Sequence, residues 1–252
     1  MPELFSKFGP EMAAVSLPAW LDLAALMVGA VSGVLVARER KLDLVGFVGL
    51  AMLCGLGGGL IRDVTMQVDS VYMLSSPYAI PAAAGMGIFA FLFPSLFDRF
   101  STLIEWVDIV SVGLFALMGT DKAIVYGLLP FSAILMGTLT GVGGGMLRDI
   151  FLGDIPRIFK PSNYYALCAL AGSTVYYVTV MVFWLGKPWA AFLCVAVTVG
   201  LRRWSLHYNV ISPNDVNLAP RVAGGVRKIT RRVSRTKSSA RRNRSSARRR
   251  NG

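Results

Sequence analysis

The sequence predicts an all-α integral membrane protein with seven transmembrane helices, arranged as two inverted three-helix repeats followed by a seventh helix. Three observations predict this fold. The chain is 54% hydrophobic and only 16% charged, and its apolar residues gather in long blocks. These blocks have roughly the 20-residue length that a helix needs to cross a membrane. The sequence also aligns with itself at a shift of 86 residues, which places Trp20 on Trp106.

Apolar windows bounded by charged residues or by Pro and Gly define the seven predicted helices. They are expected near Leu17 to Ala37, Asp43 to Met66, Tyr78 to Phe97, Glu105 to Lys122, Leu128 to Leu152, Ser162 to Leu185 and Pro188 to Trp204. The second and fifth windows contain glycine runs, so these two helices are expected to be the least regular.

The internal repeat aligns "WLD" (Trp20–Asp22) with "WVD" (Trp106–Asp108) and "GLGGGLIRD" with "GVGGGMLRD", without a gap. A shared glycine triplet and Arg-Asp pair in one register indicate a duplicated unit. A unit with three spans enters its second copy from the opposite side of the membrane. We therefore expect a pseudo-two-fold axis in the membrane plane and a path between the copies, as in many transporters and some channels. The alternative is a duplication that built only a helix bundle.

The repeat divides the chain into an N-terminal segment (1–16), a first repeat (17–103), a second repeat (104–186), a seventh helix (187–206) and a basic tail (207–252). Most Lys and Arg residues outside the spans fall on one side, namely Arg38, Arg40, Lys41, Arg99, Arg157, Lys160, Arg202, Arg203 and those of the tail. The positive-inside rule therefore predicts a cytoplasmic C-terminus and an N-terminus outside.

The net charge of +12 arises in the tail. Residues 221–252 contain 13 of the 26 Lys and Arg residues and no acidic residue, so the remaining chain has 13 basic against 14 acidic side chains. Such a segment cannot bury a core and is expected to be disordered. Attraction to anionic membrane lipid is the first interpretation. A solvated tail without a partner, or incidental contact with nucleic acid through phosphate charge, are the alternatives. No specific nucleic-acid binding is predicted.

Enzyme and metal chemistry find no support in the sequence. No hydrolase or metal-binding motif is present. The three cysteines, Cys54, Cys168 and Cys194, lie in apolar segments without the spacing of a zinc site or a disulfide framework. We therefore expect no catalytic activity, no cofactor and no bound metal.

Two glycine triplets are the first candidates for a functional site. They are Gly57, Gly58 and Gly59 in the second helix, and Gly143, Gly144 and Gly145 in the fifth. Each glycine costs about 1 kcal/mol relative to alanine inside a helix. An opened backbone within a membrane is tolerated only where it is buried in protein or lines a cavity. The triplets thus predict kinks that face the protein interior, and the alternative is close helix packing by small residues.

An Arg-Asp pair follows each triplet at the same distance, as Arg62-Asp63 and Arg148-Asp149. Because the two helices run in opposite directions, the first pair is expected toward the outside and the second toward the cytoplasm, one at each end of the path. They are candidate pore charges or gating residues. The alternative is that each pair neutralises itself and anchors a helix end.

Asp121 and Lys122 form a third charged pair, and the repeat aligns them with the apolar Leu35 and Val36. Ionisable residues within a membrane helix are functional candidates. Lys122 could thus set the electrostatics or the gating of the path. The alternative is that the fourth helix ends one turn earlier and leaves the pair in water.

The motifs "GLGGGLIRDV", "GTDKA" and "GVGGGMLRDIFLGDIPRI" occur in this order, and a final helix ends in "GLRRWSLHY". From Trp20 to Tyr208 the chain resembles the trimeric intracellular cation (TRIC) channel family, in particular its prokaryotic members, also labelled as a glycine-transporter family. The resemblance implies a homotrimer in a prokaryotic plasma membrane, with a pore in each protomer lined by the kinked second and fifth helices. It implies passage of K⁺ and, less selectively, Na⁺, and it identifies Lys122 as the characteristic lysine of the fourth helix.

The chain departs from the family pattern in two places. "TMQVDSV" follows Arg62-Asp63 where the second copy has "LGDIPRI", and Asp121 stands where an amide is expected. We predict a passive monovalent-cation channel. The alternatives are an alternating-access carrier for glycine or another small amino acid, and a membrane scaffold that conducts nothing.

Overall fold

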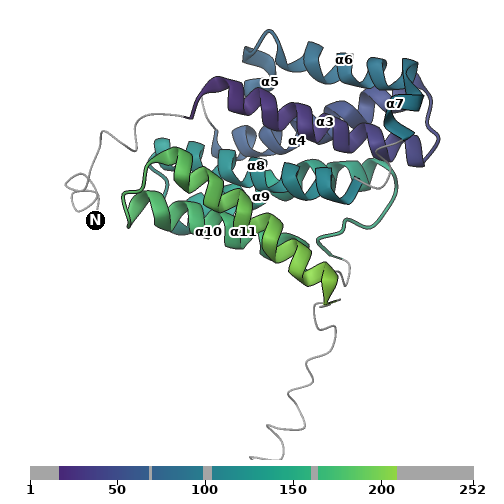
Figure 1. Cartoon of the computed structure of the whole chain (residues 1–252). Helices are drawn as coiled ribbons and strands as arrows, with labels where there is room; N and C mark the ends of the chain where they lie inside the picture. Colours follow the sequence, from purple (N-terminus) through teal and green to yellow (C-terminus); the bar gives the residue numbers. More distant parts are fainter. Residues whose placement is uncertain (1–16, 68–69, 99–103, 160–163, 209–252) are drawn as a thin grey trace, which may run out of the picture. The chain divides into compact units, whose positions relative to one another are not determined.

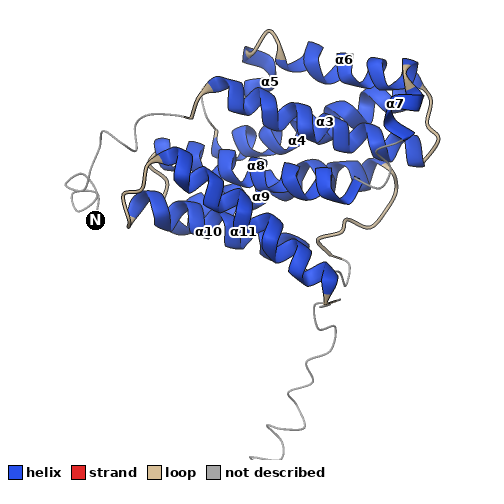
Figure 2. Ribbon diagram, viewed as in Figure 1, coloured by secondary structure: helices blue, strands red, loops and turns tan. Residues whose placement is uncertain are grey.

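A computed structural model describes the chain at residues 17–67, 70–98, 104–159 and 164–208. All regular structure in these ranges is helical (Figure 2). In chain order the helices are α3 (Ala19–Glu39), α4 (Leu44–Met66), α5 (Tyr72–Ser75), α6 (Ala79–Leu92), α7 (Pro94–Asp98), α8 (Ile104–Val125), α9 (Pro130–Phe151), α10 (Tyr165–Met181) and α11 (Lys187–His207). The predicted N-terminal segment and nearly all of the predicted tail lie outside the described residues.

The seven predicted windows all contain a helix, but several boundaries differ. The third window, Tyr78 to Phe97, holds two helices, because α6 ends at Leu92 and Pro94 begins α7. The residue before a proline is disfavoured in helical conformation. α8 continues to Val125, beyond the predicted end at Lys122, and α10 is shorter than its window.

Within the part of the chain that the structure describes, four helices are long and apolar enough to cross a membrane, namely α3 from Trp20 onward, α4, α9 and α11. α6 and α10 are apolar but shorter. α8 has 22 residues and carries charges near both of its ends, Glu105 and Asp108 at one and Asp121 and Lys122 at the other. The helices and their hydropathy are those of an integral membrane protein.

The helices of the two sequence repeats pack in the same way. α3, α4 and α6 contact one another, and α8, α9 and α10 do the same. The two groups meet where α4 packs against α9 and α3 packs against α8. α11 lies against α10 and α8 (Figure 1). The seventh helix therefore adds to the second group.

Local signals fix the ends of α4 and α9. The Asp43 side chain accepts a hydrogen bond of 2.8 Å from the backbone N–H of Gly46 and so caps the start of α4. α9 has Pro130 in its first turn, where the missing N–H costs nothing. Beyond its last turn, Gly153 has φ +73°, a conformation that favours glycine. These ends determine where the charged residues near each C-terminus lie.

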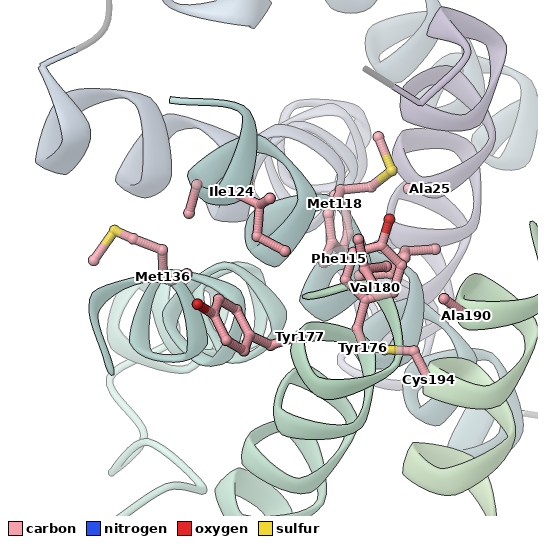
Figure 3. Packing of buried hydrophobic residues seen from close by; sticks show 13 residues of the cluster. Ala25, Phe115, Met118, Ile124, Met136, Tyr176, Tyr177, Val180, Ala190 and Cys194 are labelled. Atoms are coloured by element: carbon pink, nitrogen blue, oxygen red, sulfur yellow. The ribbon is translucent and has the colours of Figure 1, made fainter. Parts of the chain in front are cut away.

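The largest buried apolar cluster joins the second group of helices to α3 and α11 (Figure 3). Its members are Ala25, Phe115, Leu117, Met118, Ala123, Ile124, Ala133, Met136, Tyr176, Tyr177, Val180, Ala190 and Cys194. Helices within lipid gain little from the hydrophobic effect when they associate, so close van der Waals contact has to hold them together. Positions where small residues allow two backbones to approach are therefore important for this fold.

Candidate functional site

The middle glycine of each triplet lies at the crossing of α4 and α9. A Cβ atom added to Gly58 would collide with the carbonyl oxygen of Thr140, and one added to Gly144 would lie 2.7 Å from the carbonyl oxygen of Cys54. The 86-residue shift places Gly58 on Gly144 and Cys54 on Thr140. The shift therefore converts one contact into the other, which is the relation expected of contacts across a two-fold axis.

The first glycine of each triplet shows the same reciprocity. A Cβ on Gly57 would lie 2.7 Å from Leu147 Cδ1, and one on Gly143 would lie 3.0 Å from Ile61 Cδ1. Ile61 and Leu147 are again aligned by the repeat. The triplets therefore allow close helix packing, as the small-residue alternative expected.

The kinks expected at the triplets would have to form without breaking the helix. α4 and α9 are α-helical without interruption through Gly57–Gly59 and Gly143–Gly145. Among the described glycines, only Gly127 and Gly153 have positive φ. The opened backbone that the sequence suggested is thus not seen, and a bend that keeps the helix intact stays a prediction.

Arg62 and Asp63, both buried, belong to a group of charges that we call the Asp63 cluster, with the partly exposed Asp22 from α3 and Lys122 from α8. Arg62 Nε donates to Asp63 Oδ1 at 2.7 Å, and Arg62 Nη1 lies 3.8 Å from Asp22 Oδ1. Lys122 Nζ donates to the same Asp63 oxygen at 2.7 Å. The other Asp63 oxygen accepts a hydrogen bond of 2.8 Å from the backbone N–H of Tyr72.

Arg148 and Asp149 belong to a second group, the Asp149 cluster, with Asp108 from α8 and Arg157 from the segment after α9. Arg148 Nε donates to Asp149 Oδ1 at 3.0 Å, and Arg148 Nη1 donates to Asp108 Oδ1 at 3.1 Å. Arg157 donates twice, from Nη1 to Asp108 Oδ2 at 3.4 Å and from its backbone N–H to Asp149 Oδ2 at 3.0 Å. Ser32 of α3 also donates to Asp108, at 3.1 Å.

Each cluster contains two carboxylates and two cations, and the arginine of each triplet motif is its most deeply buried cation. Arg62 is 3% exposed and Arg148 is 1% exposed, so both are buried within the protein. The neighbouring Arg and Asp do pair with each other, as the helix-anchor alternative expected. The second carboxylate of each cluster, Asp22 or Asp108, comes from another helix and goes beyond that alternative. Removing one partner from a buried ion pair typically costs about 3–5 kcal/mol, because the other charge is left uncompensated.

Asp121 and Lys122 lie within α8, which excludes the alternative that the helix ends before them. Asp121 is 3% exposed. Its Oδ1 lies 2.8 Å from Lys187 Nζ and accepts a hydrogen bond of 2.8 Å from the Tyr176 hydroxyl. Asp121 and Lys122 are adjacent on α8 but have different partners, since Lys122 donates its hydrogen bond to Asp63. The carboxylate that departs from the family pattern is balanced by a lysine of α11.

Sequence reasoning did not nominate four members of these networks. Asp22 and Asp108 had a signal, since they are the aspartates of the aligned "WLD" and "WVD" motifs. Arg157 lies in the "LGDIPRI" segment that the first copy lacks. Lys187 precedes the seventh helix window and had no signal, because nothing in the sequence pairs it with Asp121.

A pocket opens beside the Asp63 cluster. It is small, with room for about one water molecule, and its lining includes Asp22, Gly59, Arg62 and Tyr72. Burial raises the pKa of the Tyr72 phenol, so its hydroxyl is neutral at physiological pH. The pocket ends against Phe115 of α8. It is therefore a recess between helices of both repeats, lined mostly by apolar groups, to which Asp22 and Arg62 contribute charge.

The described residues hold no group of His, Cys, Asp and Glu side chains arranged to bind a metal ion, and Cys54, Cys168 and Cys194 are free and buried. The expectation that no cofactor is needed stays a prediction.

The chain matches the model of a protein family described as "Glycine transporter", over residues 19–94 and again over residues 105–181. The two matched segments begin 86 residues apart, which is the offset of the internal repeat. The family model thus falls on each three-helix group in turn.

The inner membrane protein YadS of Escherichia coli is 31% identical to the chain over 198 residues, which are 74% of this chain and 92% of YadS. Among solved structures, the TRIC trimeric intracellular cation channel orthologue from Rhodobacter sphaeroides has a TM-score of 0.69 at 31% identity. The match covers 76% of this chain and 97% of the orthologue. A prokaryotic TRIC channel crystallised in 0.5 M KCl has a TM-score of 0.67 at 28% identity, over 75% of this chain and 95% of that one.

Proposed function

Because the chain belongs to the prokaryotic branch of the TRIC family, we propose that it is a homotrimeric channel for monovalent cations, with a path in each protomer. K⁺ is the main permeant ion, and Na⁺ passes less readily. The two solved relatives at 31% and 28% identity are cation channels by name. The protein resides in a bacterial inner membrane, as its Escherichia coli relative does.

One observation carries the proposal beyond family membership: α4 and α9 cross each other, and each has a cluster of charged side chains near its C-terminal end. Ionisable residues within a membrane are costly, and they mark substrate or ion paths more often than packing sites. The Asp63 cluster stands near the C-terminal end of α4, and the Asp149 cluster near that of α9. The proposed path runs from the pocket at the first cluster, past the glycine crossing, to the second cluster.

The reciprocal contacts at the crossing support an inverted pair of three-helix repeats, with α11 added as the seventh transmembrane helix. In the proposed orientation the Asp63 cluster faces the outside and the Asp149 cluster faces the cytoplasm, since Arg38, Arg40, Arg202 and Arg203 lie toward the second. The glycine triplets border the path, and the basic tail meets anionic lipid at the cytoplasmic surface.

Apart from the inverted-repeat architecture, which carriers and channels share, the alternative of a glycine carrier rests on the description of the family model, because the solved relatives are named as channels. A direct test uses purified protein in a planar bilayer with a K⁺ gradient, alongside uptake of labelled glycine into proteoliposomes. The channel predicts unitary currents that reverse near the K⁺ equilibrium potential. Saturable glycine uptake without such currents would overturn it.

A matched pair of variants on α4 shows whether the currents pass through the proposed path. The nearest atom to a Cβ on Gly59 is Arg62 Nη2 at 4.0 Å, and a Cβ on Gly49 meets nothing within 4 Å. The Cβ of Gly59→Leu therefore has room, and its side chain occupies the pocket, so this variant should reduce conduction. Gly49→Leu, which adds the same side chain away from the pocket, should leave the current unchanged.

A further inference from the structure

The residues that line the pocket beside Arg62 are mostly duplicated in the second repeat, where their counterparts surround a side chain instead. Leu26 and Leu56 line the first-repeat pocket, and the repeat aligns them with Val112 and Val142. In the second repeat these two valines pack in a buried apolar cluster with Tyr165. The space that is a recess in one repeat is thus filled in the other.

Tyr165 is the residue that fills it. It begins α10, it is 5% exposed, and a Cβ placed on Gly145 would lie 2.9 Å from its hydroxyl. At the equivalent Gly59, nothing stands closer than Arg62 Nη2 at 4.0 Å. The third glycine of each triplet therefore faces an open space in the first repeat and a tyrosine in the second.

The aligned residue in the first repeat is Ala79, which begins α6 and is fully buried. Ala79 packs against Leu26 and Leu56, the residues whose counterparts contact Tyr165. The methyl group of alanine cannot reach across to Gly59, whereas the phenol of tyrosine reaches Gly145. One pair of aligned side chains thus accounts for an open recess at one end of the proposed path and a closed one at the other.

We propose that Tyr165 is the plug that closes the second-repeat half of the ion path, and that Ala79 leaves the first-repeat half open. This inference rests on the proposed channel function for its consequence, but the plug itself can be tested without current. Withdrawal of the Tyr165 side chain from Gly145 joins the Asp149 cluster to the crossing. The closed state is then set by the second repeat.

Thiol labelling tests the plug directly. In a chain whose three native cysteines are replaced by alanine, Leu56→Cys lines the open pocket and should react with a small water-soluble methanethiosulfonate reagent. Val142→Cys, its counterpart behind Tyr165, should stay unreactive. Adding Tyr165→Ala should make Val142→Cys react at a rate close to that of Leu56→Cys, whereas Tyr165→Phe, which keeps the ring, should not.

Two labelling results would overturn the plug: a reactive Val142→Cys with Tyr165 in place, or an unreactive one in a correctly assembled Tyr165→Ala protein. Should Tyr165→Ala not assemble, Tyr165→Leu serves as the second variant, because leucine keeps apolar packing but does not reach Gly145.

Bilayer recordings then separate the plug from the proposed function. Tyr165→Ala should increase conduction, and Ala79→Tyr, which fills the first-repeat pocket, should decrease it. Absence of current in the unmodified protein contradicts the channel, while the labelling result still decides the plug. If the unmodified protein conducts normally and neither substitution alters its current, the plug is contradicted and the channel function is not.

Discussion

Gly58 of α4 and Gly144 of α9, aligned with each other by the internal repeat, each stand against the backbone of the other's helix. Gly58 faces the carbonyl of Thr140, and Gly144 faces the carbonyl of Cys54. This reciprocal contact is the one expected if the proposed two-fold axis passes between the two glycines. A side chain at either position would push the two repeats apart, because its Cβ would meet backbone that cannot rotate away.

Gly144→Ala should therefore destabilise the protein, although alanine favours helix formation. Overpacking of this kind typically costs about 1–3 kcal/mol. Gly49→Ala on α4, where a Cβ meets nothing within 4 Å, should be neutral or should stabilise by up to about 1 kcal/mol. Thermal unfolding of the detergent-solubilised protein, followed by the loss of its assembled form in size-exclusion chromatography, compares the two variants. Equal stability of the two variants would show that the contact between α4 and α9 does not require glycine at position 144.

The sequence predicted the fold well because its signals are local or repeated. Hydropathy fixes where helices lie, and one ungapped register of "GGGxxRD" identifies the duplication. The break at Pro94 had a local signal too, and the predicted third span ignored it. Helix propensity predicts kinks at the triplets and the small-residue pattern predicts close packing, and the sequence does not decide between them, because propensity omits the helix that crosses the glycines. Contact with Thr140 or Cys54 is tertiary and is not visible in the sequence.

The candidate site was predicted in part. Arg62, Asp63, Arg148, Asp149 and Lys122 do lie in buried charge clusters. Arg157 and Lys187 complete the charge balance from segments that the repeat does not align, so periodicity could not find them. Tyr165 was hidden for a different reason: a tyrosine aligned with an alanine is an ordinary mismatch until the space it fills is known.

The buried pair of Asp121 and Lys187 should contribute strongly to stability. Asp121→Asn removes the carboxylate that lies 2.8 Å from the Lys187 ammonium, and breaking a buried ion pair typically costs about 3–5 kcal/mol. Lys187→Met breaks the same pair from the other side. The double variant should be more stable than the sum of the two losses implies, which a double-mutant cycle of unfolding measurements detects. Additive losses would mean that the two charges do not interact.

Two aspartates in the second repeat should differ sharply in importance. Asp108 is 5% exposed and accepts hydrogen bonds from Arg148, Arg157 and Ser32. Asp154 forms an ion pair with Arg40 in which both side chains are more than a third exposed. Exposed pairs contribute about 0–1 kcal/mol and weaken with salt. Asp108→Asn should therefore lower the unfolding temperature markedly, and Asp154→Asn should hardly change it. A larger decrease in unfolding temperature from Asp154→Asn than from Asp108→Asn would contradict the argument that burial makes Asp108 the more important residue.

Lys122 and Arg157 should control ion entry from opposite ends of the path. Asp108, the partner of Arg157, and Lys122 are 14 residues apart on α8, which is about 21 Å along the helix axis. Both cations are partly exposed, with side chains 23% exposed for Lys122 and 41% for Arg157. A positive charge at an entrance lowers the local concentration of cations. Lys122→Gln should thus favour K⁺ entry from the outer end, and Arg157→Gln should favour entry from the cytoplasmic end.

The two variants should therefore rectify in opposite directions when current–voltage curves are recorded in symmetric KCl. The Asp63 cluster keeps Arg62 when Lys122 is neutralised, and the Asp149 cluster keeps Arg148 when Arg157 is neutralised, so each variant retains a paired cation. Lys41→Gln is the control, because it removes the same charge from an exposed turn between α3 and α4. Rectification of the same sign in both variants would mean that Lys122 and Arg157 do not stand at opposite ends of one path, since the sign of the change depends only on which end loses its charge.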